Sequence, residues 1–557
     1  MEVTPNERKT VFTRLQVFHS RDSAPKLTPY ISSHRPLHDS GSPHAFGLMG
    51  EWFQNCKSNH PVCRQTISSE TMSASERHKL PTRLVDIGPP GSNVEPCLVE
   101  TTGHPDGQWV ALSHCWGEVQ NHPLKTTRDN LVERLAGIPP SSMPKSFMDA
   151  VAVTKALGLR YIWIDSLCII QENEDDWLAE SKHMGSVYEE AVLTIAASSA
   201  ENSTKGLFIR RSYAELEVPT VQVPFINERG PGGVSEQLGE YSIDMEWRHE
   251  PFMKELDPMD TALSKRGWAT QEWILSRRII HFLDNGMVWV CKSHAGTETG
   301  YYIVGRGLPR EELSNEWGQI VQEHSSRLFT YARDRLISLD GLASKYRHLK
   351  PQDDFYAFGI WGSDMPLHLL WSPRMLTWEI KDQPWSWASY PREIWFRVRQ
   401  IATRHDCESF KSQCSILQVD LKTGMLKLMA RKKEIHSNLT RKFEFDPEDE
   451  HSFLRERANH LTGCYITMSD THTEPFGWAV FDDARRGGSI LKSREDQHIY
   501  FLYLSDVEFS TPPYSESYGL LLVEAPHGKE GFLRIGVAAI SRYSWIKDEP
   551  EVDVTII

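Results

Sequence analysis

The segment "RYIWIDSLCIIQENEDDWLAESKHMGSVYEEAVLTIAAS" (residues 160–198) decides the fold class of this chain. It opens with a short apolar run at 160–165 and closes with another at 193–198, and each run predicts a buried strand. Residues 175–191 between them predict a helix, because apolar side chains recur there at helical spacing: Trp177, Met184, Val187 and Tyr188. A strand, a helix and a second strand in this order predict two parallel strands joined by a crossover helix.

The same alternation continues on both sides of this unit. Upstream, residues 108–116 predict a strand and residues 144–157 predict a helix. Downstream, "SKRGWATQEWILSRRIIHFL" (264–283) predicts a helix capped by Ser264 and then a strand, which the Asp-Asn-Gly turn at 284–286 folds back as a hairpin. We therefore predict an α/β domain with a mainly parallel sheet and helices on both faces.

One residue does not fit the apolar stripe of the downstream helix. Trp268, Glu272 and Leu275 share a face, because residues three and four apart lie above one another on a helix. A carboxylate in that position is either a surface group paired with a nearby arginine or part of the wall of a cleft. Its place beside Trp268 favours the cleft.

The length of 557 residues exceeds what one hydrophobic core usually serves, so two or three domains are expected. Residues 1–80 predict an irregular lead segment with one helix near "GLMGEWFQNC". The α/β domain is expected at 81–310, with an insertion of roughly 60 residues before its last helix. A helical connector at 311–380 and an antiparallel β-rich C-terminal domain at 381–557 complete the prediction.

Charge and cysteine content narrow the classes of function. The net charge of −14 argues against nucleic acid and anionic membranes as partners. The nine cysteines are scattered and odd in number, which favours a reducing compartment over a disulfide scaffold. The N-terminus lacks the apolar core of a signal peptide, and no apolar run reaches the about 18 residues of a membrane span. These features predict a cytoplasmic protein.

A possible metal motif lies in the lead segment. "CKSNHPVC" places Cys56, His60 and Cys63 at a C-x3-H-x2-C spacing, which offers three zinc ligands. A fourth ligand has to come from elsewhere, and Cys97 and His104 are candidates. The alternative is a set of reduced thiols packed beside a histidine.

Polar residues gather after each predicted parallel strand. In doubly wound sheets, ligands bind outside the carboxyl ends of the strands. The groups expected at this edge are Ser113, His114, Cys115, Trp116 and Gly117 after the first strand, Asp165, Ser166 and Cys168 after the second, and Ser198 and Ser199 after the third. We expect them to meet at one rim.

Each of these groups has a structural alternative. Asp165 is also a suitable N-cap or turn residue, and Trp116 is also a suitable core residue. His114 and Cys115 suggest a cysteine–histidine nucleophile pair, but adjacent residues on a strand point to opposite faces. That geometry argues against a cysteine protease. We predict no metal ligand in this rim site.

Three blocks of the sequence resemble the signature blocks of the fungal heterokaryon-incompatibility (HET) domain, in the order of that family. They are "WVALSHCWG", the segment from "YIWID" to "TIAAS", and "RGWATQEWILSRRIIHF", and the resemblance covers about residues 108–275. The chain departs from the family's commonest residues at Ile170, Gly267 and Ala269, where the family usually has Asn, Ala and Thr.

HET domains in turn resemble Toll/interleukin-receptor (TIR) domains, which have a flavodoxin-like sheet. "WATQEW" has the Trp-to-Glu spacing of the TIR block W-C-x-x-E-L, whose glutamate carries catalysis in NAD-cleaving members. The resemblance therefore implies Glu272 as the catalytic residue. It implies that substrate is bound by Ser113, His114, Trp116, Gly117, Asp165 and Trp268.

The resemblance also implies a function. It points to a fungal incompatibility protein whose HET domain triggers programmed cell death in non-self recognition, by hydrolysis of NAD at the nicotinamide–ribose bond. No cofactor is expected, since NAD is then the substrate. The partners implied are a nucleotide-type small molecule, an incompatibility partner protein, and a second copy of the chain. A non-enzymatic TIR-like signalling module and a HET-like biosynthetic enzyme are the alternatives.

Overall fold

The structure is a computed structural model, and it divides into two compact units, Met1–Ser314 and Asn315–Ile557. Each unit is described by itself. The described residues are 14–18, 37–64, 80–102, 107–211, 220–227, 236–246, 256–300, 317–373, 385–396, 407–435, 439–440, 463–467, 475–482, 498–510, 513–526, 529–541 and 543–557. His104, one of the two candidate fourth zinc ligands, lies outside them, and the domain boundaries predicted from the sequence stay predictions.

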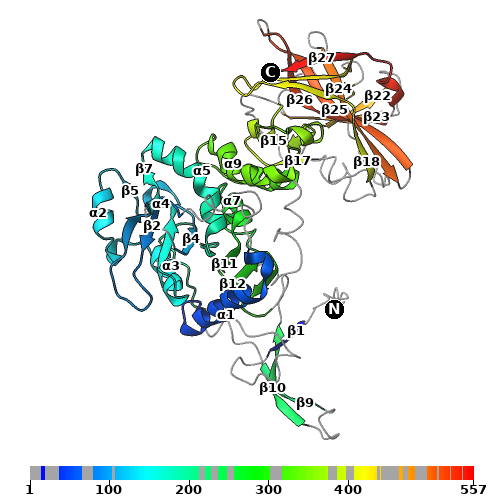
Figure 1. Ribbon diagram of the computed structural model, residues 1–557. Coiled ribbons are helices and arrows are strands. Elements are labelled where there is room, and N and C mark those ends of the chain that lie inside the picture. Colours follow the sequence, from blue (N-terminus) through cyan, green and yellow to red (C-terminus); the bar gives the residue numbers. More distant parts are fainter. Residues whose placement is uncertain are drawn as a thin grey trace, which may run out of the picture. The chain divides into compact units, whose positions relative to one another are not determined.

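An eight-stranded sheet forms the centre of the first unit, in the order β13-β12-β11-β8-β4-β6-β2-β3 (Figure 1). Its strands are β2 (Arg83–Asp86), β3 (Cys97–Glu100), β4 (Trp109–Ser113), β6 (Tyr161–Ile164), β8 (Leu193–Ala196), β11 (Arg278–Leu283), β12 (Gly286–Cys291) and β13 (His294–Thr297). The four strands in the middle, β11-β8-β4-β6, run parallel. Strands β4, β6 and β8 lie within the runs predicted at 108–116, 160–165 and 193–198.

The sheet is mixed, so the prediction of a mainly parallel sheet holds only for its centre. Antiparallel pairs flank the parallel strands: β11 with β12 and β12 with β13 on one side, and β6 with β2 and β2 with β3 on the other. The β11–β12 hairpin is the one predicted from the turn at 284–286. The β2–β3 pair was not predicted, because such short strands carry little periodicity.

Helices cover both faces of this sheet, as predicted. They are α1 (Pro43–Asn59) and α3 (Lys145–Ala156), which contact each other, and α5 (Glu174–Glu190) and α7 (Ala269–Leu275), which also contact each other. Trp52 of α1 contacts Trp289 of β12, and Trp289 lies directly opposite Ile280 of β11 in the β11–β12 pair. The next residue of β11, His281, contacts Trp273 of α7. Since adjacent strand residues point to opposite faces, α1 and α7 lie on opposite sides.

Helix α7 begins later than the sequence predicted. Ser264 lies in a 3-10 turn at Leu263–Lys265, and its hydroxyl bonds to the carbonyl oxygens of Met259 and Thr261. The N-cap of the helix is Trp268. The predicted cap was wrong because the side chain of Ser264 is already engaged in the preceding turn.

Shorter elements complete the first unit. They are β1 (Arg14–Phe18), β5 (Thr126–Thr127), α2 (Leu131–Ala136), α4 (Asp165–Cys168), β7 (Ile170–Gln171), β9 (Thr220–Asn227) and β10 (Glu236–Glu246). The predicted insertion contributes β9 and β10, which form a small antiparallel sheet with β1.

The second unit starts with helices and continues as an antiparallel β structure. Its helices are α8 (Trp317–Ser325), α9 (Asp334–Tyr346) and α10 (Met365–His368). Its strands are β14 (Tyr356–Ala357), β15 (Ile360–Trp361), β16 (Trp371–Pro373), β17 (Ile394–Phe396), β18 (Cys407–Ser412), β19 (Ser415–Val419), β20 (Leu426–Glu434), β21 (Leu439–Thr440), β22 (Gly463–Thr467), β23 (Pro475–Phe481), β24 (Ile499–Ser510), β25 (Pro513–Glu524), β26 (Phe532–Ile540) and β27 (Glu551–Ile556). Strand β24 pairs with β20, β20 with β27, β27 with β26, β26 with β25, and β25 again with β24, so these strands form a closed ring.

The β-rich character predicted for the C-terminal part is therefore confirmed. All pairs of its large sheet are antiparallel except β26 with β27. Among the described residues, every helix is too short or too polar to traverse a lipid bilayer.

The packing of the parallel strands predicts a large difference between two leucines. Leu193 on β8 is fully buried, whereas Leu178 on α5 is 43% exposed. We expect Leu193→Ala to lower the free energy of unfolding by about 2–5 kcal/mol, because it leaves a cavity in the centre of the sheet. Leu178→Ala, the matched control, should change it by about 0.5 kcal/mol or less. Chemical unfolding followed by tryptophan fluorescence measures both, and equal losses would contradict this packing.

Candidate active site

The candidate site lies at the carboxyl ends of the central parallel strands. Ser113 is the last residue of β4, and its hydroxyl donates a hydrogen bond to Oε2 of Glu272 on α7. Both side chains are fully buried. Asp165 directly follows β6 and is also buried. The parallel topology thus gathers three residues that are widely separated in the sequence.

Arg266 joins the two carboxylates of the site. Its Nη2 atom lies 3.0 Å from Oδ2 of Asp165, and its Nη1 atom lies 3.7 Å from Oε1 of Glu272. It also donates a hydrogen bond to the carbonyl oxygen of His114. Burial opposes the charge of Arg266, but the carboxylates of Glu272 and Asp165 raise the pKa of this guanidinium above its ordinary value. A single cation therefore neutralises part of a buried negative pair.

Asp165 accepts hydrogen bonds from two further groups. Its Oδ2 atom accepts from Nε1 of Trp116 at 2.9 Å, and its Oδ1 atom accepts from the backbone N–H of Ser166 at 2.7 Å. The second bond is local and belongs to the first turn of α4. Asp165 thus serves as a turn residue, which is the structural alternative predicted for it, and as a member of the buried charge network.

His114 points to the other face of the sheet from Ser113. Its ring contacts Phe147 of α3 with centroids 5.1 Å apart, and its Nδ1 atom lies 3.6 Å from Oδ1 of Asp165. Burial lowers the pKa of His114 to about 4; the charge of Asp165 acts in the opposite direction, and that of Arg266 lowers it further. The imidazole is therefore neutral near pH 7.

Cys115 does not form a nucleophile pair with His114. It packs in an apolar cluster with Leu263 and Trp273. Burial raises the pKa of the Cys115 thiol to about 11, so the reactive thiolate is disfavoured. The geometry agrees with the argument from strand alternation against a cysteine protease.

The remaining predicted residues lie around this network. Gly117 has a φ of +77°, and an added Cβ there would come within 2.5 Å of the Cβ of Asn202, so only glycine fits. Trp268 is half-buried and meets the ring of Trp177 edge to face, with centroids 6.4 Å apart.

The expectation that Glu272 lines an open cleft is not met. The side chain of Glu272 has no exposed surface, while that of Arg266 is 22% exposed. Arg266 and the carboxylates that it bridges close the site. This pairing explains why the fold tolerates the charged Glu272 on the apolar face of α7. Sequence reasoning did not single out Arg266, although two carboxylates buried close together require a cation nearby.

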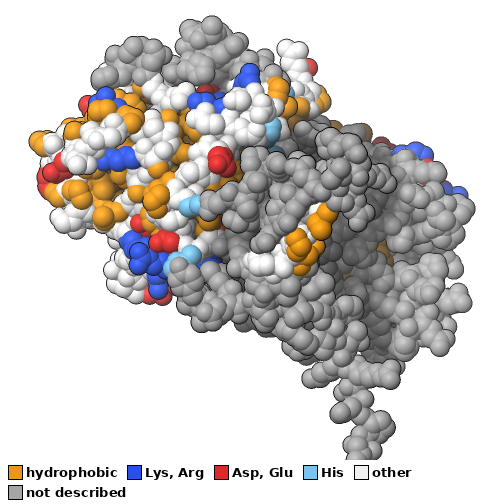
Figure 2. Space-filling model, turned by 90° about the horizontal axis from the view of Figure 1, so that it is seen from below, with side chains coloured by type: hydrophobic (Ala, Val, Ile, Leu, Met, Phe, Trp, Pro, Cys, Tyr) orange, Lys and Arg blue, Asp and Glu red, His pale blue; other side chains and the backbone are white. Residues whose placement is uncertain are grey.

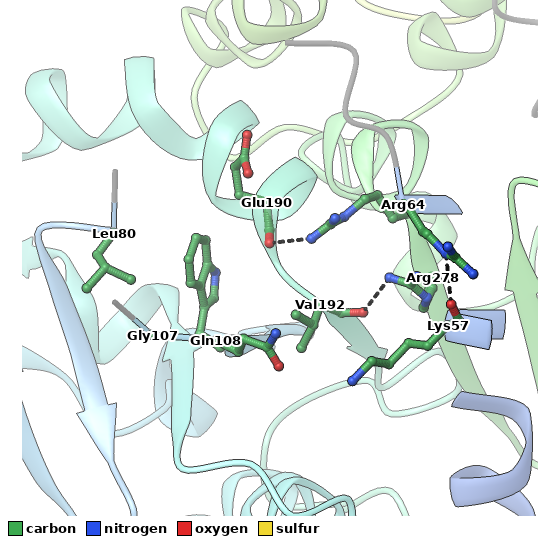
Figure 3. Close-up of a pocket in the computed structure, with 10 residues that line it drawn as sticks. Lys57, Arg64, Leu80, Gly107, Gln108, Glu190, Val192 and Arg278 are labelled. Carbon is green, nitrogen blue, oxygen red and sulfur yellow. Dashed lines mark hydrogen bonds between the residues drawn. The ribbon is translucent and has the colours of Figure 1, made fainter. Parts of the chain in front are cut away.

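A pocket of about 710 Å³ lies at the opposite ends of the same strands (Figure 3). Trp109 at the start of β4 and Arg278 at the start of β11 line it, together with Lys57, Arg64 and Arg277. Arg277 donates to the carbonyl oxygen of Glu190, and Arg278 donates to that of Val192. The pocket is therefore separate from the Ser113–Glu272 site, and the sequence carried no motif for it.

Metal-ligating side chains also gather away from the candidate site. The cluster consists of Cys56, His60, Cys63 and Cys291. Cys97 lies on the edge strand β3 and is not part of it. The C-x3-H-x2-C motif thus has a fourth neighbour that sequence spacing did not reveal, because Cys291 is more than 200 residues away.

Charged side chains of both signs are interspersed on one face of the molecule. Figure 2 shows lysine, arginine, aspartate and glutamate side chains scattered in small mixed groups among hydrophobic and neutral ones on the described part of that face. The expectation from net charge that nucleic acid is not a partner stays a prediction.

Comparison with known families bears on the same region. Residues 109–272 match the sequence model of a family described as "Heterokaryon incompatibility protein (HET)". This segment is a HET domain. No curated protein and no solved structure matches the chain at a significant level.

The HET match begins at the first residue of β4 and ends at Glu272. It therefore contains all the residues predicted for the site. Helix α1, the β11–β12 hairpin and the second unit lie outside the matched segment.

Buried His114 predicts a pH dependence of stability. Its pKa is about 4 in the folded protein and about 6.5 when unfolded, so the unfolded chain binds the extra proton in this window. The stability it contributes is present above pH 6.5 and is lost as the pH falls towards 4, by about 3 kcal/mol. Unfolding measured at pH 7 and pH 4 should show a smaller loss for His114→Gln than for the parent.

His44, which is exposed at the start of α1, is the matched control. His44→Gln should keep the parental pH dependence. The assignment fails if His114→Gln loses as much stability as the parent between the two pH values.

Proposed function

We propose that this chain is a heterokaryon incompatibility-type protein whose HET domain hydrolyses NAD at the nicotinamide–ribose bond and thereby triggers cell death. The observation that carries the proposal is the buried Glu272 carboxylate, hydrogen-bonded to Ser113 at the carboxyl edge of the parallel strands. Ligand sites of doubly wound sheets lie at this edge, so a buried carboxylate there is a candidate functional group.

The strand order supports a TIR-like, flavodoxin-like relationship. Numbered along the chain, β4, β6, β8 and β11 are first to fourth, and they lie in the order 2-1-3-4. This is the beginning of the flavodoxin-like order 2-1-3-4-5, in which ligands bind where the first and third strands part. Ser113 ends the first of these strands, and Ser198 closely follows the third.

The chemistry requires a negative charge near the ribose. As the bond between ribose C1′ and the nicotinamide nitrogen breaks, its electron pair leaves with nicotinamide and positive charge develops on the ribose. The Glu272 carboxylate stabilises that charge, and Ser113 orients the carboxylate. Water then adds its oxygen to C1′ and releases one proton, which gives ADP-ribose and nicotinamide.

The surrounding residues fit the binding of a nucleotide. In this proposal Trp268 and Trp116 provide aromatic surfaces for rings, and Gly117 lets the backbone approach the ligand closely. Asp165 accepts hydrogen bonds from ribose hydroxyls, and neutral His114 supports Asp165 from the other face of the sheet.

The closed site fits a protein that is inactive until triggered. Because Glu272 has no exposed surface and Arg266 bridges it to Asp165, substrate reaches it only after Arg266 moves aside. We propose that an incompatibility partner protein or self-association of the chain drives this opening in the cytoplasm of a fungal cell. The trigger then supplies the free energy that separates Arg266 from the two carboxylates.

A second candidate function is a non-enzymatic interaction module. The full burial of Glu272 and its 3.7 Å approach to Arg266 favour it, because a closed ion-pair network also stabilises a fold without binding substrate. A catalytic role and a purely structural role of Glu272 predict different effects on activity when its negative charge is removed.

The test is release of nicotinamide from NAD by the purified full-length protein, with cell death on expression as a parallel readout. Glu272→Gln should reduce nicotinamide release by roughly 10²-fold or more, because a neutral amide does not offset positive charge on ribose. It should keep the fold, since Arg266 retains Asp165 and the amide oxygen still accepts from Ser113.

Glu180→Gln is the matched control. Glu180 is also buried, 3.6 Å from Arg83, and that arginine keeps Asp176 as its second partner. Glu180→Gln should retain activity. A folded Glu272→Gln protein that releases nicotinamide or kills at the parental rate would refute the catalytic role and favour the interaction module.

A further inference from the structure

Three cysteines and one histidine converge at the end of α1. Cys56 lies in the last turn of the helix, and His60 follows it as the C-cap. Pro61 ends the helix, and a 3-10 turn over Pro61–Arg64 brings Cys63 back beside the other two. Backbone bonds from His60 N–H to Cys56 and from Cys63 N–H to His60 fix this fold-back.

The fourth member comes from the central sheet. Cys291 is the last residue of β12, and its Sγ atom lies 3.3 Å from Nδ1 of His60, which is 231 positions away in the chain. The three sulfur atoms and the imidazole nitrogen all lie within 4.8 Å of one another. All three cysteines are free thiols and are buried.

We propose a structural zinc site in which one Zn²⁺ ion is bound by Cys56, His60, Cys63 and Cys291. Tetrahedral zinc with Zn–S bonds of about 2.3 Å and a Zn–N bond of about 2.0–2.1 Å separates its ligand atoms by roughly 3.5–4 Å. The cluster needs only small side-chain adjustments to reach that geometry. Thiolate and imidazole ligands in a Cys₃His set select zinc over magnesium or calcium.

Arg278 supplies the outer shell of this site. Its Nε atom donates to Cys56 Sγ at 3.1 Å, and its Nη2 atom donates to the carbonyl oxygen of Cys63 at 3.0 Å. Three thiolates, a neutral imidazole and Zn²⁺ carry a net charge of −1, which the buried guanidinium cancels. A cation held against thiol sulfur is expected where that sulfur is a thiolate.

The site is structural rather than catalytic. Four protein ligands leave no open position for water or substrate. The ion would fasten α1 to β12 from outside the HET segment, next to the contact between Trp52 and Trp289. Metal binding then contributes directly to the stability of this unit. The proposal rests on no part of the NAD-cleaving activity.

The test measures zinc in the full-length protein purified without chelator. We expect about one zinc per chain for the parent and for Cys97→Ser, the control cysteine on β3. Cys291→Ser and Cys63→Ser should lose the metal and melt at lower temperature. In case these variants do not fold, exchange of the parent with cobalt(II) is the second measurement, and it should produce the visible bands of tetrahedral thiolate-bound cobalt.

Two results would overturn the proposal. One is a folded, reduced parent protein that contains no zinc and gives no cobalt bands. The other is a disulfide between two of the three cysteines in protein purified under reducing conditions, detected by peptide mass spectrometry. Retention of full zinc content by Cys291→Ser would remove Cys291 from the site and contradict the assignment as stated.

Discussion

The ion-pair network of Arg266 with Asp165 and Glu272 is the interaction on which the centre of the first unit depends. Two carboxylates are buried at the carboxyl ends of parallel strands, where an unpaired charge would cost several kcal/mol. Arg266 reaches both and also holds the carbonyl oxygen that follows β4. It thereby connects the end of β4, the start of α4 and helix α7.

This arrangement gives one set of residues two roles. The charges that hold α7 against the sheet are also the groups that the proposed chemistry requires. Under the proposed function, such a site is stable while closed and becomes reactive only when the cation is drawn away from Glu272. The free energy of the ion pair would then set how strongly the proposed activity is held off without a trigger.

Much of the first unit could be predicted from short sequence patterns. The apolar runs that became β4, β6 and β8 and the turn after β11 carry local signals, so their positions followed from periodicity and turn chemistry. The mixed edges of the sheet did not follow, because β2 and β3 are only four residues long. Pairing direction at an edge depends on tertiary contacts rather than on local pattern.

In the candidate site, too, some features could be predicted from the sequence and others depend on tertiary contacts. The position of Ser113, Asp165 and Glu272 at strand ends or on the facing helix was readable from the order of the elements. The ion pairs that Arg266 forms with Asp165 and Glu272 could not be predicted, because an arginine in a turn has no periodicity that reveals its partners. Cys291 was missed as a neighbour of Cys56 for a related reason: contacts between distant segments leave no trace in spacing.

A double-mutant cycle between Arg266→Met and Glu272→Gln tests the central claim most directly. The free energy of unfolding is measured for the parent, the two single variants and the double variant. If Arg266 and Glu272 form a coupled buried pair, the double variant should be more stable than the sum of the single losses predicts, by roughly 1–3 kcal/mol. Losses that add to within about 0.5 kcal/mol would show that the two groups act independently and would contradict this account.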